Sequence, residues 1–151
     1  MADHPLRQIQ DIIALLNSSL DHATIRKRAI EAATLLMNAE AGSLLLLEEA
    51  TGELYFDVAH GEKGETVRQA RLQPGQGIAG HVARTGEPII VHDVQRDARF
   101  FRHIDQTSGF VTRSMVCVPV TAHGHFLGVL QAINHKNGDS FGEDDLLNFV
   151  A

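Results

Sequence analysis

The stretch Gly75-Gln-Gly-Ile-Ala-Gly80 decides between two fold classes for this chain. Its spacing matches the G-x-G-x-x-G loop that binds dinucleotides at the start of a helix. That loop needs a strand before the glycines and a crossover to a parallel strand after them. Here the glycines lead into a short helix at residues 78–85, with Gly86 as its C-cap, and then into the strand Pro88-Ile-Ile-Val91 in an antiparallel context. We therefore reject dinucleotide binding and expect a turn within an antiparallel fold.

Four segments on either side of the glycines have the character of strands joined in pairs by tight turns. They are residues 43–48 and 53–60, joined at residues 49–52, and residues 113–121 and 125–134, joined at residues 123–124. A further strand is expected at residues 67–72. Because hairpins pair neighbouring strands antiparallel, the pattern predicts an α+β fold with an antiparallel sheet.

An N-terminal helix is marked by an apolar stripe at helical spacing. The stripe consists of Leu6, Ile9, Ile13, Leu16 and Leu20. This helix either packs on its own domain or pairs with a second copy in a coiled coil. We therefore separate a connecting or dimerisation helix, residues 1–20, from one domain, residues 21–151.

A second helix is expected from Asp21, its N-cap, to about Asn38. Its apolar face is formed by Ile25, Ala29, Ala33 and Leu36. Residues 100–108 also have helical character, and a capping box at residues 140–143 begins a final helix. The sequence stops within that last helical pattern, so we expect the helix to continue into an output domain.

Composition excludes several classes of function. The chain has 151 residues, of which 44% are hydrophobic and 21% charged, as in one globular domain. Its net charge of -6 opposes nonspecific attraction to nucleic acid. The lone Cys117 excludes an internal disulfide and fits a reducing compartment. The apolar runs are too short to span a membrane. We expect a cytoplasmic protein with no nucleic-acid or membrane partner.

Five motifs, taken in their order along the chain, resemble those of GAF domains. They are Gly75-Gln-Gly-Ile-Ala-Gly-His-Val-Ala-Arg-Thr-Gly-Glu-Pro88, Asp93 with Asp97-Ala-Arg-Phe100, Arg113-Ser-Met-Val-Cys-Val-Pro-Val120, Leu127-Gly-Val-Leu-Gln-Ala-Ile-Asn134 and Phe141-Gly-Glu-Asp-Asp-Leu146. The resemblance covers about residues 20–151. It implies a six-stranded antiparallel sheet with helices on one face and a pocket on the other. It also implies that the domain senses a small molecule and modulates an attached output domain.

Within that family the chain is similar to the cyclic-nucleotide-binding GAF domains of phosphodiesterases and adenylyl cyclases, through residues 76–83 and 105–113. The resemblance implies nucleotide contacts at Ser43, Ile78, Ala79, Phe101, Asp105, Ser108 and Thr112. These roles are chemically sensible. The helix N-terminus offers amides to a phosphate, the aromatic ring stacks on a base, and the polar side chains supply hydrogen bonds.

Two departures from those relatives leave the identity of the ligand open. Ala59 and His60 stand where the family has a base-reading Phe-Asp pair, and Gln131 stands where it has a glutamate. The Gln131 amide still offers a donor and an acceptor, but guanine recognition is weakened. The family's Lys-Asp salt bridge becomes at best a pair between His135 and Asp145, which depends on pH near about 6.5.

Metal and catalytic sites lack support in the sequence. The nine histidines include no helical i,i+4 pair, and no nucleophile stands beside a base at diagnostic spacing. The reductases among GAF domains use several cysteines, whereas this chain has one. We expect no metal and no enzymatic activity. The two functions that remain are a ligand sensor, with a cyclic nucleotide as the implied ligand class, and a module without a ligand that dimerises through its terminal helices.

Overall fold

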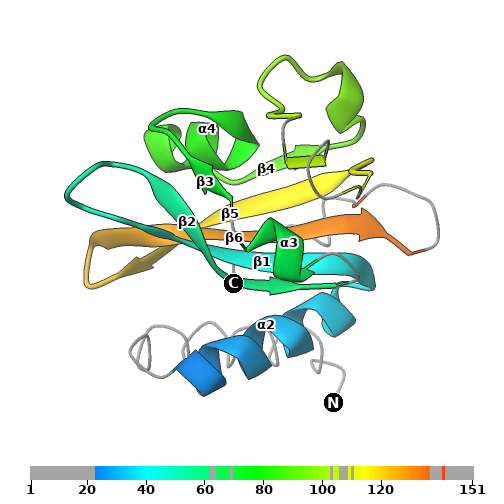
Figure 1. The fold of residues 1–151 in the computed structure, drawn as a ribbon, viewed down its shortest axis with the longest axis horizontal. Coiled ribbons are helices and arrows are strands. Elements are labelled where there is room, and N and C mark those ends of the chain that lie inside the picture. Colours follow the sequence, from blue (N-terminus) through cyan, green and yellow to red (C-terminus); the bar gives the residue numbers. More distant parts are fainter. Residues whose placement is uncertain are drawn as a thin grey trace.

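The computed structural model describes residues 23–61, 64–68, 70–102, 104–105, 109, 111–136 and 141. These residues form a six-stranded sheet with the strand order β3-β2-β1-β6-β5-β4 (Figure 1). Every strand pair is antiparallel, which confirms the predicted α+β class. The strands are β1 (Ala39–Leu47), β2 (Leu54–His60), β3 (Arg71–Leu72), β4 (Ile89–Val91), β5 (Met115–Ala122) and β6 (His125–His135).

Two hydrophobic cores lie on opposite faces of this sheet. Side chains alternate between the faces of a strand, so Leu44 and Leu45 of β1 enter different cores. Helix α2 (Ala23–Leu36) covers the first core, where Ile30 packs in the same cluster as Leu44. Helix α4 (Gly77–Thr85) covers the second, where Val82 packs with Leu45 (Figure 1). The face opposite α2 is therefore covered as well, by α4 and the short α3 (Gly64–Val67).

The inward face of α2 differs from the prediction. Leu36 was placed inward but is 37% exposed, whereas Arg26 and Ile30 are buried. The cause is a bidentate ion pair, in which Arg26 Nε lies 2.6 Å from Asp57 Oδ2 and Nη2 lies 3.1 Å from Oδ1. Because Asp57 belongs to β2, the ion pair holds the Arg26 side of α2 against the sheet. The spacing of apolar residues alone does not reveal this orientation of the helix.

Two predicted elements are corrected by the structure. Residues 67–72 do not form one strand, because α3 ends at Val67 and β3 contains only Arg71–Leu72. Helix α3 packs closely on β2, since a Cβ atom at Gly64 would lie 2.2 Å from the Ala59 carbonyl oxygen. Residues 100–102 are not helical, although Ile104 and Asp105 are.

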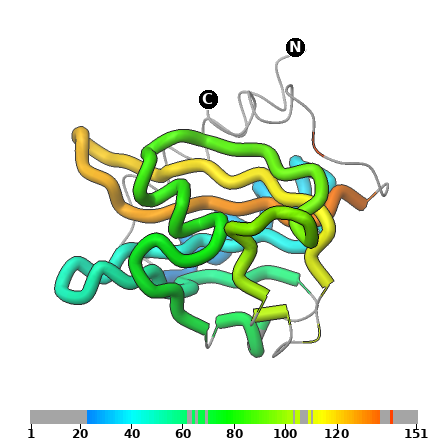
Figure 2. The backbone as a smooth tube through the Cα atoms, turned by 90° about the horizontal axis from the view of Figure 1, so that it is seen from above, coloured from blue at the N-terminus to red at the C-terminus, as the bar shows by residue number. Residues whose placement is uncertain are grey.

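The segment after the glycines has the predicted form. Helix α4 ends at Gly86, whose left-handed φ of 73° lets its N–H donate to the Val82 carbonyl oxygen. Strand β4 then pairs antiparallel with β5, so the parallel crossover of a dinucleotide fold does not follow the glycines. Figure 2 shows α4 and the chain after it crossing above β5 and β6.

Several predictions fall outside the described residues. They concern the helix at residues 1–20, the cap at Asp21, the site residue Ser108, the helix after residue 140 and the pair between His135 and Asp145. His135 itself contacts the Phe141 ring edge-on, with 5.5 Å between the ring centroids. Within the part of the chain that is described, none of the helices combines the length and the apolar character needed to cross a membrane.

Candidate ligand-binding site

A cavity of about 60 Å³ lies between the sheet and α4. Its walls are mostly apolar, and their polar side chains are Asp105, Thr112 and Gln131. Six of the predicted site residues line it, namely Ile78, Ala79, Phe101, Asp105, Thr112 and Gln131. The tertiary structure thus brings together residues from α4, the segment before β5, and β6.

The remaining described site residues line a second, smaller cavity. It measures about 30 Å³ and is bordered by Ser43, Ala59 and His60. Val67 and Ile133 line both cavities, so the two are neighbours on the same face of the sheet. The predicted site is therefore divided into two compartments, a feature that the motifs did not indicate.

Gly77, the first residue of α4, brings bare backbone to the cavity, and Gly75 shapes the turn before it. Gly75 and Gly77 both have φ of 76°, and a Cβ atom at Gly80 would lie 2.7 Å from the Gly75 carbonyl carbon. The N-cap residue Gln76 makes no side-chain cap. The N-terminal amides of α4, which include those of the buried Ile78 and Ala79, therefore carry the positive end of the helix dipole without a capping side chain.

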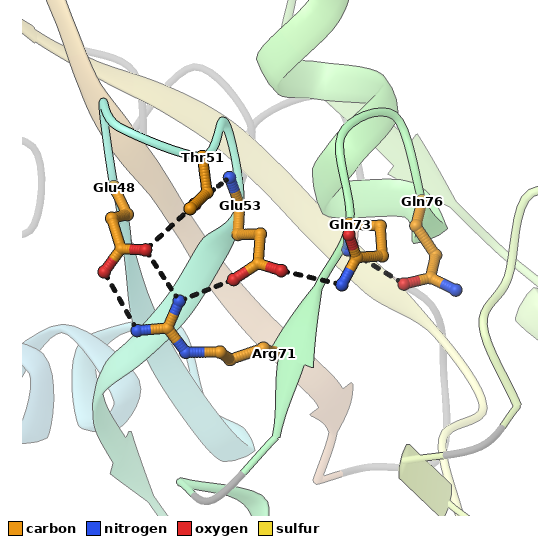
Figure 3. A network of polar contacts seen from close by, with 6 residues as sticks. All are labelled: Glu48, Thr51, Glu53, Arg71, Gln73 and Gln76. Carbon is orange, nitrogen blue, oxygen red and sulfur yellow. Dashed lines mark hydrogen bonds and ion pairs between the residues drawn. The ribbon is translucent and has the colours of Figure 1, made fainter.

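A surface network that sequence reasoning missed holds the turn before α4 (Figure 3). Gln76 Oε1 accepts a hydrogen bond from the Gln73 N–H at 2.9 Å, and Gln73 Nε2 donates to Glu53 at 2.8 Å. Arg71 joins Glu53 to Glu48 across the first hairpin. Its hydrogen bonds hold the pKa of the Glu48 carboxyl below its usual value. The network connects residues far apart in sequence, so no local motif marks it.

Asp105 and Thr112 both line the larger cavity and are hydrogen-bonded to each other. The Thr112 N–H donates to Asp105 Oδ2 and its hydroxyl to Oδ1, both at 2.8 Å. Gln95 Nε2 donates to the Thr112 carbonyl oxygen. Each carboxylate oxygen of Asp105 thus accepts one hydrogen bond from Thr112, and we interpret the pair as a wall of the cavity.

Replacing Thr112 by valine is expected to lower the free energy of unfolding by about 1.5 kcal/mol, because it removes a hydrogen bond to a charged group while keeping the shape. Urea denaturation measures the change. Thr121→Val is the matched control, since Thr121 lies exposed on β5 and should tolerate the change. Equal losses in the two variants would show that the Asp105–Thr112 pair does not hold the wall.

Asn134 clamps the segment that carries Thr112. This residue is fully buried with φ of 58°, and its Oδ1 accepts hydrogen bonds from the N–H groups of Arg113 and Ser114. Its Nδ2 donates to the Val111 carbonyl oxygen and to Glu40 Oε1. The sequence marked Asn134 as part of a family signature, but only the structure shows these four bonds.

Glu40 is also bonded to Arg113, at 2.7 Å. This hydrogen bond is the main reason that the pKa of the Glu40 carboxyl lies below its usual value of 4.5. Because the pKa of Glu40 is lower in the folded state, the pair contributes its full stability above the usual pKa of 4.5. This stability is lost as the pH falls through the lower pKa of the folded state. The clamp is thus weakened only under acidic conditions.

Reactive and metal-binding groups are not assembled in the part of the chain that the structure describes. Cys117 is completely buried, and burial raises the pKa of its thiol, so it stays protonated. No cluster of His, Cys, Asp or Glu residues among the described positions has the arrangement of a metal site.

An antiparallel sheet with a helix across one face, and a cavity beneath a glycine-initiated helix on the other, defines an α+β domain with a cavity on one side of its sheet. The family model described as GAF domain matches residues 21–151, and the chain belongs to this family.

Curated relatives include phosphodiesterases. The Drosophila melanogaster protein named Dual 3',5'-cyclic-AMP and -GMP phosphodiesterase 11 is 32% identical over 91% of this chain. The Caenorhabditis elegans protein named Probable 3',5'-cyclic phosphodiesterase pde-5 is 30% identical over 73% of it. The chain spans only 10% and 16% of the lengths of these two relatives.

Solved structures share the fold. The GAF domain of a phosphoenolpyruvate-protein phosphotransferase from Coxiella burnetii superposes with a TM-score of 0.75 at 19% identity, covering 95% of this chain and 86% of that one. Free methionine-R-sulfoxide reductase from Neisseria meningitidis, in complex with its substrate, gives a TM-score of 0.71 at 16% identity, covering 94% and 78%. One architecture thus occurs in differently named proteins, so the fold alone does not select a function.

Proposed function

We propose that this chain is a regulatory sensor domain that binds a small molecule in the cavity beneath α4 and modulates an output domain of the same protein. The observation that carries the proposal is the meeting of two kinds of polar group in one apolar cavity. The first residues of α4, Gly77 to Ala79, line it on one side, and Gln131, a residue only 5% exposed, lines it on the other. Such convergence of a few polar groups in an apolar hollow is typical of ligand sites.

A cyclic nucleotide is the ligand class that we propose first. The helix N-terminus suits its phosphate, and two of the curated relatives are named as cyclic-nucleotide phosphodiesterases. The cavity of about 60 Å³ is smaller than the roughly 300 Å³ at the lower end of small-molecule sites. Binding therefore requires the cavity walls to move apart, and this opening is the change that a sensor transmits.

The test is calorimetric titration of the chain with cAMP and cGMP, with 5'-AMP as the non-cyclic comparison. Saturable binding that Ala79→Leu abolishes supports the proposal, because a larger side chain there fills the cavity. Ala98→Leu, at an exposed turn, is the matched control and should bind as the unmodified chain does. If neither nucleotide binds, or if Ala79→Leu binds unchanged, cyclic-nucleotide sensing at this site is refuted.

We infer that the domain binds rather than catalyses, and that it functions in the cytoplasm. The protonated, buried thiol of Cys117 supports the first part of this inference, since a thiol must ionise to act as a nucleophile. A second function, homodimerisation, is supported by the adjacent apolar pair Leu35 and Leu36, which are 70% and 37% exposed on α2. Sedimentation of the chain beside Leu35→Lys tests it, with a monomeric unmodified chain as the refuting result.

A further inference from the structure

We propose that the polar network in Figure 3 is a latch, through which the tip of the first hairpin controls how readily the first turn of α4 opens. The latch consists of the six residues that the figure labels, namely Glu48, Thr51, Glu53, Arg71, Gln73 and Gln76. Its role in opening the cavity rests on the proposed function, which requires the walls to move. The coupling between hairpin and helix is a separate property, and it is tested without a ligand.

One end of the latch is the turn at residues 73–76. The Gln76 N–H donates to the Gln73 carbonyl oxygen, and the Gln73 N–H donates to Gln76 Oε1, both at 2.9 Å. Pro74 and Gly75, with φ of 76° at the glycine, give the turn the residue order of type II. A Cβ atom at Gly80 would lie 2.7 Å from the Gly75 carbonyl carbon. The first turn of α4 therefore packs directly on this turn, and the two move together.

The other end of the latch is the first hairpin. Glu48 follows β1 and Glu53 precedes β2, so the hairpin brings two carboxylates together. Arg71 Nη1 donates to Glu53 Oε1 at 2.7 Å, and its two Nη atoms donate to the Glu48 oxygens at 3.2 Å. The remaining oxygen of Glu53 accepts from Gln73 Nε2 at 2.8 Å. Arg71 thus holds two like charges side by side, and Glu53 passes the connection on to the turn.

The backbone attaches this turn to the sheet only weakly. Strand β3 pairs with β2 at two register positions, Leu54 with Leu72 and Tyr55 with Arg71. The turn also touches the hairpin tip, since a Cβ atom at Gly52 would lie 3.1 Å from a Pro74 side-chain carbon. Because so short a strand supplies few backbone hydrogen bonds, the side chains of the latch provide much of the attachment.

The latch is weak enough to release without unfolding the domain. The Arg71 side chain is 43% exposed, and an exposed ion-pair network stabilises only slightly and is screened by salt. Ile78 and Val82 of α4 are buried in the core beneath the helix, so opening is confined to the first turn. Local openings of this kind are governed by the least stable contacts of a structure.

Hydrogen exchange of the unliganded chain, followed residue by residue, tests the coupling. The reporting amides belong to Gln76 and Gly80, whose N–H groups donate to the Gln73 and Gln76 carbonyl oxygens. Glu48→Gln is expected to speed their exchange by about threefold, the size of one exposed ion pair. Glu49→Gln is the matched control, because it removes the same charge from an exposed neighbour outside the latch. It should leave both rates unchanged.

Arg71→Gln should speed the exchange of the same two amides by about fivefold, since it disconnects both carboxylates. Raising NaCl from about 0.05 M to about 1 M should accelerate the unmodified chain similarly and leave Arg71→Gln unaffected. The amides of β6 should keep their rates throughout, which shows that the fold is intact. Equal rates in Glu48→Gln and Glu49→Gln, or an equal salt effect in Arg71→Gln, would overturn the latch.

The latch and the sensor function fail in different ways. If both latch variants speed exchange at the turn but cyclic nucleotides do not bind, the coupling stands and cyclic-nucleotide sensing is refuted. If cyclic nucleotides bind while neither variant changes the exchange of Gln76 and Gly80, the sensor function stands and the latch is refuted.

Discussion

Asn134→Ala is expected to lower the free energy of unfolding by about 3 kcal/mol, since it leaves buried backbone groups without partners. The side chain of Asn134 accepts from the N–H groups of Arg113 and Ser114 and donates to the Val111 carbonyl oxygen. Alanine also tolerates a φ of 58° less well than asparagine. Urea denaturation monitored by circular dichroism measures the loss.

Asn38→Ala is the matched control for this variant. Asn38 has a similar φ of 54° but is exposed, so its replacement reports backbone strain alone. We expect a loss of about 1 kcal/mol there. If the two variants lost the same stability, the clamp around residues 111–114 would contribute nothing. Asn134→Asp extends the test, because its carboxylate would face Glu40 and the resulting repulsion should weaken as the pH is lowered.

Gly128→Ala is expected to cost about 3 kcal/mol, at the upper end for overpacking, because the added carbon meets backbone and not a flexible side chain. A Cβ atom at Gly128 would lie 2.0 Å from the Leu45 carbonyl oxygen and 3.0 Å from the Leu46 Cα. Strands β1 and β6 would have to separate at the centre of the sheet. Because β1 and β6 carry Ser43 and Gln131, the floor of the site would be displaced with them.

Gly124→Ala provides the comparison within the same hairpin. Both substitutions remove the same backbone freedom from the unfolded chain, so that contribution cancels. Apart from its chain neighbours, no described residue has an atom within 4 Å of a Cβ at Gly124, so the φ of 78° is what opposes alanine there. We expect a loss of about 1 kcal/mol. A Gly128 variant as stable as the Gly124 variant would contradict the close approach of the two strands.

Much of the candidate site was predictable, because its motifs are local. The glycines before α4 predicted a turn and a helix N-terminus, and both are present. Phe101, Asp105 and Thr112 were assigned to the same pocket as Ile78, and they line the same cavity. The division between the two cavities was not predictable, since Val67 was expected in a strand and instead ends a helix.

The sequence by itself determined the antiparallel α+β class and the turn before α4. Hairpin turns, alternation of apolar residues and glycines with positive φ act over a few neighbouring positions, so they can be read from the chain. Only the tertiary structure decided which polar groups are already satisfied. The Asp105 carboxylate accepts hydrogen bonds from Thr112, and Arg26 is drawn inward by Asp57. These outcomes depend on tertiary contacts, which the local sequence pattern does not predict.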